Sequence, residues 1–308
     1  MDSMDEIERI HQSVLLQEVL DFLRPRSGGI YMDGTLGLGG HTQAILSASA
    51  PEGRVVGFEW DENAIQRSSI RLAEYGSRLV IVRRNFAEIA AGLEDAGVSY
   101  LDGLLIDIGL SSLQLDMGER GFSFQRDEPL DMRMDTRREV TAASILATCS
   151  EEELADIFYY YGEERQARRI AGEVVRQRQL EAIRTSKQLA ILVARAVPKK
   201  FHPPRIHVAT RVFQALRIAV NTELENLARI LDEAPAFLKP GARMCVISFH
   251  SLEDRMVKRK FRDNPDLQVL TTRPVAAGAD ELAANPRSRS AKLRVAERKD
   301  RDSTGETQ

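Results

Sequence analysis

The segment from Asp33 to Thr42 carries residue types that could bind a small charged ligand. It reads Asp33-GTLGLGGHT, so Gly37, Gly39 and Gly40 lie close together and His41 follows directly. Glycines let a backbone turn sharply and approach a ligand closely, and the start of a following helix provides free N–H groups. The segment lacks the G-x-G-x-x-G fingerprint of dinucleotide-binding proteins. It therefore favours S-adenosylmethionine over a nicotinamide dinucleotide.

Three carboxylates stand where apolar runs end. Glu59 closes the run Val55-VGF, where a carboxylate can accept hydrogen bonds from both hydroxyls of a ribose, and Asp61 is a second candidate. Asp33 precedes the glycine turn, and we expect it to face the amino group of a methionine moiety. Asp107 ends the run Leu101-DGLLI and is expected over the same cleft, which makes it the favoured place for chemistry.

The elements that position these residues follow from the apolar pattern. Four short runs, Gly29-IYMD, Val55-VGFE, Leu79-VIV and Leu101-DGLLIDIG, are typical of buried strands and alternate with stretches of helical spacing. This alternation predicts an α/β fold with a parallel sheet. Because ligands bind at the carboxyl ends of such strands, the glycine turn, Glu59 and Asp107 should share one cleft.

The alternation stops after Asp107. We expect an inserted helical domain at 113–205, flanked by the two parts of the α/β domain at 1–112 and 206–299. The second part should contain a long helix from Ala209 to Leu238, a Lys239-Pro-Gly turn, the strand Ala242-RMCVISF and a last strand near Ala291-KLRVAE. Residues 264–290 are expected to be irregular, and 300–308 a disordered tail.

Composition excludes several classes of protein. Among 308 residues no apolar run approaches the roughly 18 needed to span a membrane, and the acidic N-terminus lacks the pattern of a signal peptide, so we expect the cytoplasm. The two cysteines, Cys149 and Cys245, argue against a disulfide framework or a cysteine zinc site. The net charge is −3, yet basic residues concentrate in 165–187, 195–217 and 287–301. These runs are either solvated helix faces or contacts for a phosphate backbone.

Longer sequence blocks resemble one known family. The chain resembles the ribosomal RNA small subunit methyltransferase H family, also called MraW. The blocks that carry the resemblance run from near the first residue to near the last: His11-QSVLLQEVL, Asp33-GTLGLGGHT, Asp107-IGLSSLQLD, Glu119-RGFSFQRDEPLDMRMD, Tyr161-GEERQARRIA, Ala209-TRVFQALRIAVNTEL, Ile247-SFHSLEDRMVKRKF and Asn285-PRSRSAKLRVAER. The resemblance implies a Rossmann-like S-adenosylmethionine-dependent methyltransferase with an inserted helical domain. It also implies methyl transfer to N4 of a cytidine in the decoding centre (P-site region) of bacterial 16S rRNA.

The resemblance also implies which residues hold the cofactor. The family's positions for S-adenosylmethionine fall here on Gly39, Gly40, His41, Glu59, Phe86, Asp107 and Gln114. Two positions depart from the family pattern. Glu59 stands where aspartate is common, which moves the carboxylate by one methylene, and Leu113 stands where proline is usual.

For the chemistry, we expect Asp107 to be the polar group nearest the target amine, assisted by Ser111 and Ser112. A carboxylate that accepts an N4–H bond favours pyramidalisation of the nitrogen and can receive the proton. Other amino-methyltransferases use an (Asp/Asn/Ser)-Pro-Pro-aromatic element here, which Asp107-Ile-Gly-Leu does not match, so the acceptor remains open. No metal is required, and Asp131 and Asp135 with Arg133 between them are interpreted as a salt-bridged loop.

The candidates for substrate binding are a few residues near the second half of the sheet. A flipped base needs an aromatic platform, for which Phe249 is a candidate and Phe122 and Phe124 are competitors. His250 either donates to the base carbonyl or is a satisfied histidine at a strand end. Arg289 belongs to a basic run that could contact RNA.

Several alternatives stay open. The partner is expected to be 16S rRNA, either naked or within the small ribosomal subunit, and the protein could be a monomer or a homodimer. The insertion could serve RNA docking, dimer contacts or lid closure. A nicotinamide-dependent oxidoreductase lacks its glycine fingerprint, and a non-catalytic RNA-binding module gives no reason for Glu59, Asp107 and the glycines to line one cleft.

Overall fold

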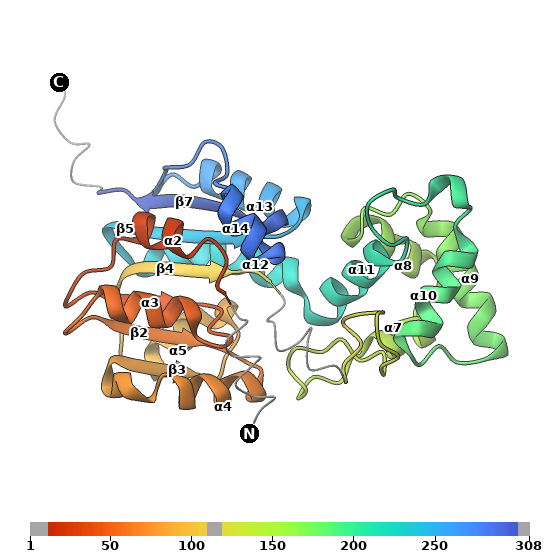
Figure 1. Cartoon of the computed structure of the whole chain (residues 1–308), viewed down its shortest axis with the longest axis horizontal. Helices are drawn as coiled ribbons and strands as arrows, with labels where there is room; N and C mark the ends of the chain where they lie inside the picture. Colours follow the sequence, from red (N-terminus) through yellow and green to blue (C-terminus); the bar gives the residue numbers. More distant parts are fainter. Residues whose placement is uncertain (1–11, 110–118, 301–308) are drawn as a thin grey trace. The chain divides into compact units, whose positions relative to one another are not determined.

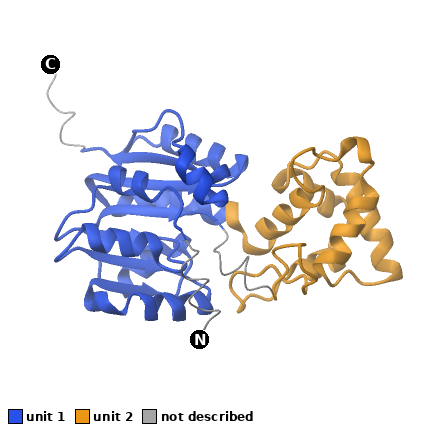
Figure 2. Cartoon of the chain, in the orientation of Figure 1, with its two compact units in different colours: residues 1–111, 225–308 blue, residues 112–224 orange. Residues whose placement is uncertain are grey.

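A computed structural model describes residues 12–109 and 119–300, which form two compact units (Figure 2). The first unit contains the described residues up to 109 and from 225 onward. The second unit contains residues 119–224. Among the expected site residues, Ser111, Ser112 and Gln114 lie outside the described ranges, as do Leu113 and the tail 301–308.

The first unit is built around a seven-stranded sheet with the order β3-β2-β1-β4-β5-β7-β6 (Figure 1). Strands β1 to β5 run parallel to one another, whereas β7 runs antiparallel to both β5 and β6. The strands are β1 Ile30–Asp33, β2 Arg54–Phe58, β3 Leu79–Val82, β4 Leu101–Asp107, β5 Leu238–Ser248, β6 Leu267–Val269 and β7 Lys292–Arg298.

Helices cover both faces of this sheet, because neighbouring strand residues point to opposite sides. Val56 and Leu104 belong to one apolar cluster with α5, α12 and α13, while Val55 and Leu105 belong to another with α2 and α3. The helical elements are α2 Leu16–Leu23, α3 Gly40–Ala48, α4 Glu62–Arg71, η1 Ala73–Arg78, η2 Phe86–Glu88, α5 Ile89–Asp95, α12 Glu223–Glu233, η5 Ala234–Phe237, α13 Ser251–Asp263, α14 Ala279–Ala284 and η6 Pro286–Ser290.

The second unit is helical. Its elements are α7 Ala142–Thr148, α8 Glu151–Asp156, η3 Ile157–Tyr161, α9 Ala167–Leu180, α10 Ser186–Ala196, η4 Lys199–Phe201 and α11 Thr210–Asn221. Helices α7, α8 and α10 begin with side-chain caps from Thr141, Ser150 and Thr185, which explains where these helices start.

The structure differs from the sequence-based expectation between 206 and 240. The single helix expected from Ala209 to Leu238 is two helices, α11 and α12, because Thr222 adopts a left-handed conformation (φ 51°) that ends α11. Helix α11 packs on α7 and η3, so the second unit extends to Leu224 rather than ending at 205. The Lys239-Pro-Gly segment lies inside β5, where the pairing register with β4 shifts.

The segment expected to be irregular, 264–290, contains three short elements. Strand β6 pairs with β7, and α14 and η6 follow. Helix α14 is tied to the start of the described chain, since Glu281 Oε1 accepts from Leu15 N at 2.8 Å. Asn285 Nδ2 likewise donates to Gln12 O at 2.9 Å.

Candidate active site

The carboxyl ends of β1, β2, β3 and β4 bring the expected polar residues to one edge of the sheet. Asp33 pairs in register with Gly57 on one side and with Leu105 on the other. Glu59 directly follows β2, and its N–H donates to Val82 O at the end of β3 at 3.1 Å. Strand pairing therefore places Asp33, Glu59 and Asp107 on neighbouring strand ends, as the sequence predicts.

The glycine turn depends on conformations that side chains rarely adopt. Gly37 and Gly39 have φ values of 52° and 81°. A Cβ built on Gly39 would lie 2.6 Å from Leu72 Cδ1, so a side chain at this position would also have to displace Leu72. The turn delivers the chain into α3, whose first residue is Gly40 and whose second is His41.

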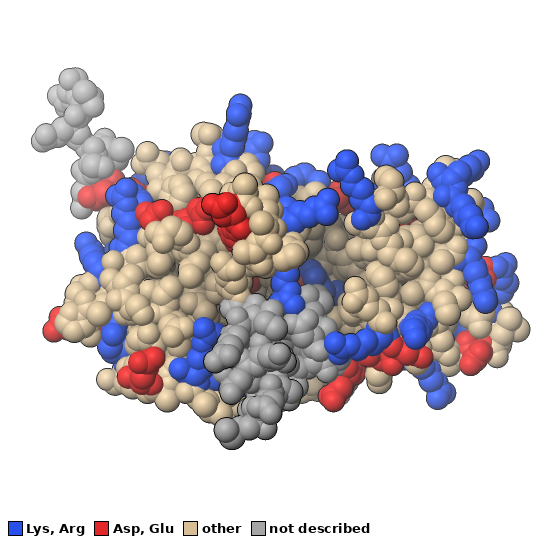
Figure 3. Space-filling view, in the orientation of Figure 1, with Lys and Arg blue, Asp and Glu red and all other residues tan. Residues whose placement is uncertain are grey.

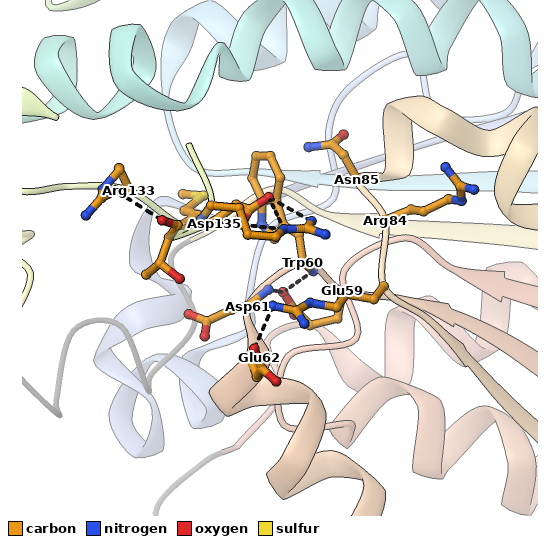
Figure 4. A network of polar contacts seen from close by, with 12 residues as sticks. Glu59, Trp60, Asp61, Glu62, Arg84, Asn85, Arg133 and Asp135 are labelled. Carbon is orange, nitrogen blue, oxygen red and sulfur yellow. Dashed lines mark hydrogen bonds and ion pairs between the residues drawn. The ribbon is translucent and has the colours of Figure 1, made fainter. Parts of the chain in front are cut away.

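Glu59 is held by backbone N–H groups from two turns. Its Oε1 accepts from Trp60 N and Asp61 N, and its Oε2 accepts from Gly37 N, each at 2.9 Å (Figure 4). Burial, together with the nearby charge of Asp61, raises the pKa of Glu59 to about 7 against these stabilising hydrogen bonds. Because a carboxylate offers about four lone-pair sites, one acceptor site on Oε2 is left for a hydroxyl donor.

Asp33 lies deeper than expected for a ligand contact. It is 1% exposed, and its two oxygens accept from Thr42 Oγ1 at 2.7 Å and Thr35 N at 3.1 Å. Burial raises the pKa of this carboxyl. The structure thus has Asp33 linking both ends of the glycine turn, and its contact with a cofactor amino group stays a prediction.

His41 and Asp107 form the least satisfied polar pair at this edge. His41 Nε2 lies 3.6 Å from Asp107 Oδ2, and His41 is 7% exposed. Both ring nitrogens of His41 and Oδ1 of Asp107 are buried without a hydrogen-bond partner among the described residues. Asp107 is fixed at its backbone, since its N–H donates to Thr35 Oγ1 at 2.7 Å. Unpaired buried polar atoms are costly, so their presence indicates a site that binds polar groups.

Asn85 was missed by the sequence-based reasoning. It caps η2 through Oδ1, which accepts from Ala87 N at 2.8 Å, and Glu88 completes the capping box. This orientation leaves Nδ2 buried without a hydrogen-bond partner in the described part of the chain. Asn85 and Glu59 are both drawn in Figure 4, following β3 and β2. The Asn-x-x-Glu spacing of a capping box was the signal that could have located this residue.

Phe86 follows Asn85 and is partly buried against the core. A Cβ built on Gly34 would lie 3.2 Å from Phe86 Cβ, so the residue after Asp33 is small where it faces the Phe86 side chain. Phe86 is therefore adjacent to the end of β1, at the same edge as the other expected cofactor residues.

The end of β5 carries the expected substrate residues Phe249 and His250. A Cβ on Gly109 would lie 2.9 Å from Phe249 Cε2, which shows that Gly109 makes room for this ring. His250 is the N-cap of α13, where Nδ1 accepts from Glu253 N at 3.4 Å. His250 Nε2 lies 2.9 Å from Oε1 of the buried Glu253. Both of these buried atoms lack a hydrogen-bond partner among the described residues, so both roles considered for His250 stay predictions.

The remaining expected residues lie elsewhere. Arg289 is exposed on η6 of the first unit. Phe122 is buried and Phe124 packs on Phe213 within the second unit, with ring centroids 5.1 Å apart. In the same unit Asp131 pairs with Arg133 at 2.7 Å and Asp135 with Arg137 at 2.8 Å, which confirms the salt-bridged loop.

The fold and the residues at this edge of the sheet together define the class of protein. A β3-β2-β1-β4-β5-β7-β6 sheet with β7 reversed, and a glycine turn followed by a carboxylate at the end of β2, describe a Rossmann-like methyltransferase. The chain belongs to the MraW methylase family, whose family model matches residues 8–299. It is accordingly a methyltransferase, and S-adenosylmethionine is its methyl donor.

Relatives are similar over almost the whole chain. A protein of Desulfotalea psychrophila named "Ribosomal RNA small subunit methyltransferase H" is 69% identical over 293 residues, which cover 95% of this chain and 99% of the relative. A protein of the same name from a Cyanothece species is 52% identical, covering 96% and 97%. A third, from Geotalea uraniireducens, is 49% identical, covering 94% and 98%.

Two further findings concern membrane-spanning helices and surface charge. No helix in residues 12–109 and 119–300 is both long and apolar enough to cross a membrane. Lys and Arg side chains are visible in groups over the second unit in the space-filling view (Figure 3).

Proposed function

We propose that this protein transfers the methyl group of S-adenosylmethionine to N4 of a cytidine in the decoding centre, near the P site, of bacterial 16S rRNA. The names of the relatives support an RNA of the small ribosomal subunit as the substrate. The observation that carries the chemistry is the buried, unpartnered Oδ1 of Asp107 at the end of β4, an acceptor without a donor among the described residues.

The residues at the strand ends fit S-adenosylmethionine. Glu59 has an acceptor site for a ribose hydroxyl, and Asn85 Nδ2 has a free donor for a ring nitrogen of adenine. His41 and the turn around Gly37 and Gly39 would hold the methionine end, beside the positive φ residues that let the backbone approach. When bound, this cofactor supplies an electrophilic methyl group on a sulfonium.

Asp107 is the proposed acceptor for the hydrogen bond and the proton of the target amine. The N4 lone pair of cytosine is conjugated with the ring, so the nitrogen must pyramidalise before it attacks. An N4–H bond accepted by Asp107 Oδ1 favours that change. As the N–C bond forms, the C–S electron pair passes to sulfur and the amine proton leaves to the carboxylate. Ser111 and Ser112 are assigned to assist this step, and Gln114 to contact the cofactor.

The partner assigned here is the 16S rRNA within the small ribosomal subunit, so the reaction takes place in the cytoplasm. Phe249 would receive the flipped base from the end of β5, next to Gly109. Arg289 on η6 of the same unit would contact the RNA backbone.

The test is incorporation of labelled methyl into small ribosomal subunits from a strain that lacks this activity, followed by nucleoside analysis. We expect N4-methylcytidine with the wild-type protein and none with Asp107→Asn. Asp95→Asn is the matched control, because Asp95 is an exposed carboxylate on α5 that pairs with Arg84. Label in another nucleoside, or none on subunits or on naked 16S rRNA, would refute the assignment of substrate and atom.

A further inference from the structure

One stretch of the second unit has an unusual charge. Residues 182–222 contain eight Lys and Arg and no Asp or Glu, although the whole chain has a net charge of −3. Six of the eight are exposed: Arg184, Lys187, Arg195, Lys199, Lys200 and Arg205. A basic surface of this kind, within a chain of nearly balanced charge, is complementary to a phosphate backbone.

The pairing of these six side chains also bears on what they can bind. Within the residues that the structure describes, none of the six has an ion pair. By contrast, Arg83, Arg229 and Lys260 of the first unit each pair with a carboxylate, at 2.6–2.8 Å. A cation without a carboxylate partner can contact phosphate without first giving up an ion pair.

An exposed aromatic directly follows two of these cations, Lys199 and Lys200, in the chain. Phe201 ends η4 and is 50% exposed, and Lys200 Nζ lies 5.0 Å from the centroid of its ring. One face of the ring is thus next to a cation, and exposure leaves area for a second planar group. Phe201 is the only Phe among residues 198–207, which we call the 198–207 loop.

The 198–207 loop is held in place. Phe201 N donates to Pro198 O at 2.8 Å, and His202 Nε2 lies 2.9 Å from Val197 O. Pro203 and Pro204 follow, and each proline fixes its own φ. At the far end, the His207 ring packs on Phe124, with centroids 4.6 Å apart. An aromatic on a constrained loop loses little conformational entropy when it binds.

We propose that the 198–207 loop binds a single-stranded segment of the RNA substrate, with Phe201 stacking on a base and Lys199, Lys200 and Arg205 contacting its phosphates. This inference rests on the proposed function, because it takes RNA as the substrate. Unpaired bases can stack on an aromatic ring, whereas bases inside a helix cannot, so the loop selects single strands over duplexes.

The electrostatic part is tested by binding of a fluorescein-labelled, single-stranded 12-nucleotide RNA to the full chain at several salt concentrations. The variant Lys199→Ala/Lys200→Ala/Arg205→Ala should bind at least tenfold more weakly, and its log–log salt slope should be shallower by about 2, since each phosphate contact to a single strand contributes about 0.7. The control Arg229→Ala/Lys260→Ala/Arg262→Ala removes the same charge from ion pairs of the first unit and should change neither value.

The stacking part is tested with Phe201→Ala and Phe201→Trp in the same assay. Phe201→Ala should weaken binding by about tenfold with an unchanged salt slope, because stacking of one base is independent of salt, and Phe201→Trp should restore it. Melting temperature and S-adenosylhomocysteine affinity should match the wild type in all loop variants, which separates RNA binding from folding and cofactor binding.

Three outcomes would overturn the inference. The first is a wild-type protein that methylates RNA, with loop variants that bind RNA and methylate it equally well. The second is a duplex of the same sequence that binds as tightly as the single strand. The third is polyglutamate that competes as well as RNA, which would assign the loop to an acidic protein. A wild-type protein that methylates no RNA would instead refute the proposed function.

Discussion

His41 Nε2 lies 3.6 Å from Asp107 Oδ2, although the two residues come from the turns after different strands. The first turn of α3 presents His41, and the end of β4 presents Asp107. Both side chains carry buried polar atoms without hydrogen-bond partners in the described part of the chain. A ligand that hydrogen-bonds to one side chain can therefore affect the other. The pair therefore connects the cofactor side of the site to Asp107, which we propose as the acceptor of the amine proton.

Replacement of His41 should affect the methyl-transfer step. His41→Leu removes the nitrogen beside Asp107, and we expect the single-turnover rate to fall by about 100-fold, the lower end of the contribution of groups that assist a proton transfer. His41→Gln, which keeps a polar atom of similar reach, should lose less. Equal rates for the Leu and Gln variants would mean that the ring only fills space.

Cofactor affinity should depend on pH through Glu59. A ribose hydroxyl that donates to Glu59 favours its ionised form, and the pKa of this residue is raised to about 7. S-adenosylhomocysteine affinity should therefore rise with pH to a plateau above pH 7 and fall by up to about tenfold per unit below it. Calorimetric titration between pH 5.5 and 8.5 measures this. Glu59→Gln should bind weakly with a flat profile, and a flat wild-type profile would contradict the prediction.

Glu59 should also make the protein less stable at neutral than at acidic pH. Since its folded-state pKa of about 7 exceeds its ordinary value of 4.5, the folded state binds more protons, and stability falls as pH rises between these values. The decrease from this one group is on the order of 3 kcal/mol. Urea unfolding at pH 5 and pH 8 should show this difference for the wild type and a smaller one for Glu59→Gln. An identical pH dependence in both proteins would exclude Glu59 as its source.

Gly39 should be intolerant of substitution for two separable reasons. Gly39→Ala combines a φ of 81° with a Cβ 2.6 Å from Leu72, and we expect a loss of about 2–4 kcal/mol of stability. Gly97→Ala is the control, because Gly97 has a φ of 63° and nothing within 4 Å of its Cβ, so it should lose only about 1 kcal/mol. Denaturant unfolding measures both, and equal losses would show that contact with Leu72 is unimportant.

Three of the strand ends could be predicted from the sequence because the apolar run stops at a carboxylate. β1, β2 and β4 end at or directly before Asp33, Glu59 and Asp107, and parallel pairing then forces these residues to one edge. The pattern of apolar residues marks each strand within a few positions, so the first part of the sheet could be predicted from the sequence.

Other features are set by tertiary context and leave no local pattern. Thr222 breaks a continuous helical pattern through one left-handed residue, a conformation that no propensity of threonine predicts. Strand β6 is three residues long, too short for a period to appear. The depth of Asp33 depends on Thr35 and Thr42 closing over it, which only the folded turn reveals.

The position of the second unit in the chain has a consequence for how the protein folds. Strands β4 and β5 are neighbours, with Asp107 opposite Ile247, yet the whole second unit is synthesised between them. The centre of the sheet therefore closes only after residues 119–224 have left the ribosome. The entropy of closing this connection grows only with the logarithm of its length, and prior folding of the second unit shortens the flexible part. Until then, the half-sheet β1–β4 has an unpaired edge with which other chains can pair. This interval of synthesis is therefore the one most exposed to aggregation.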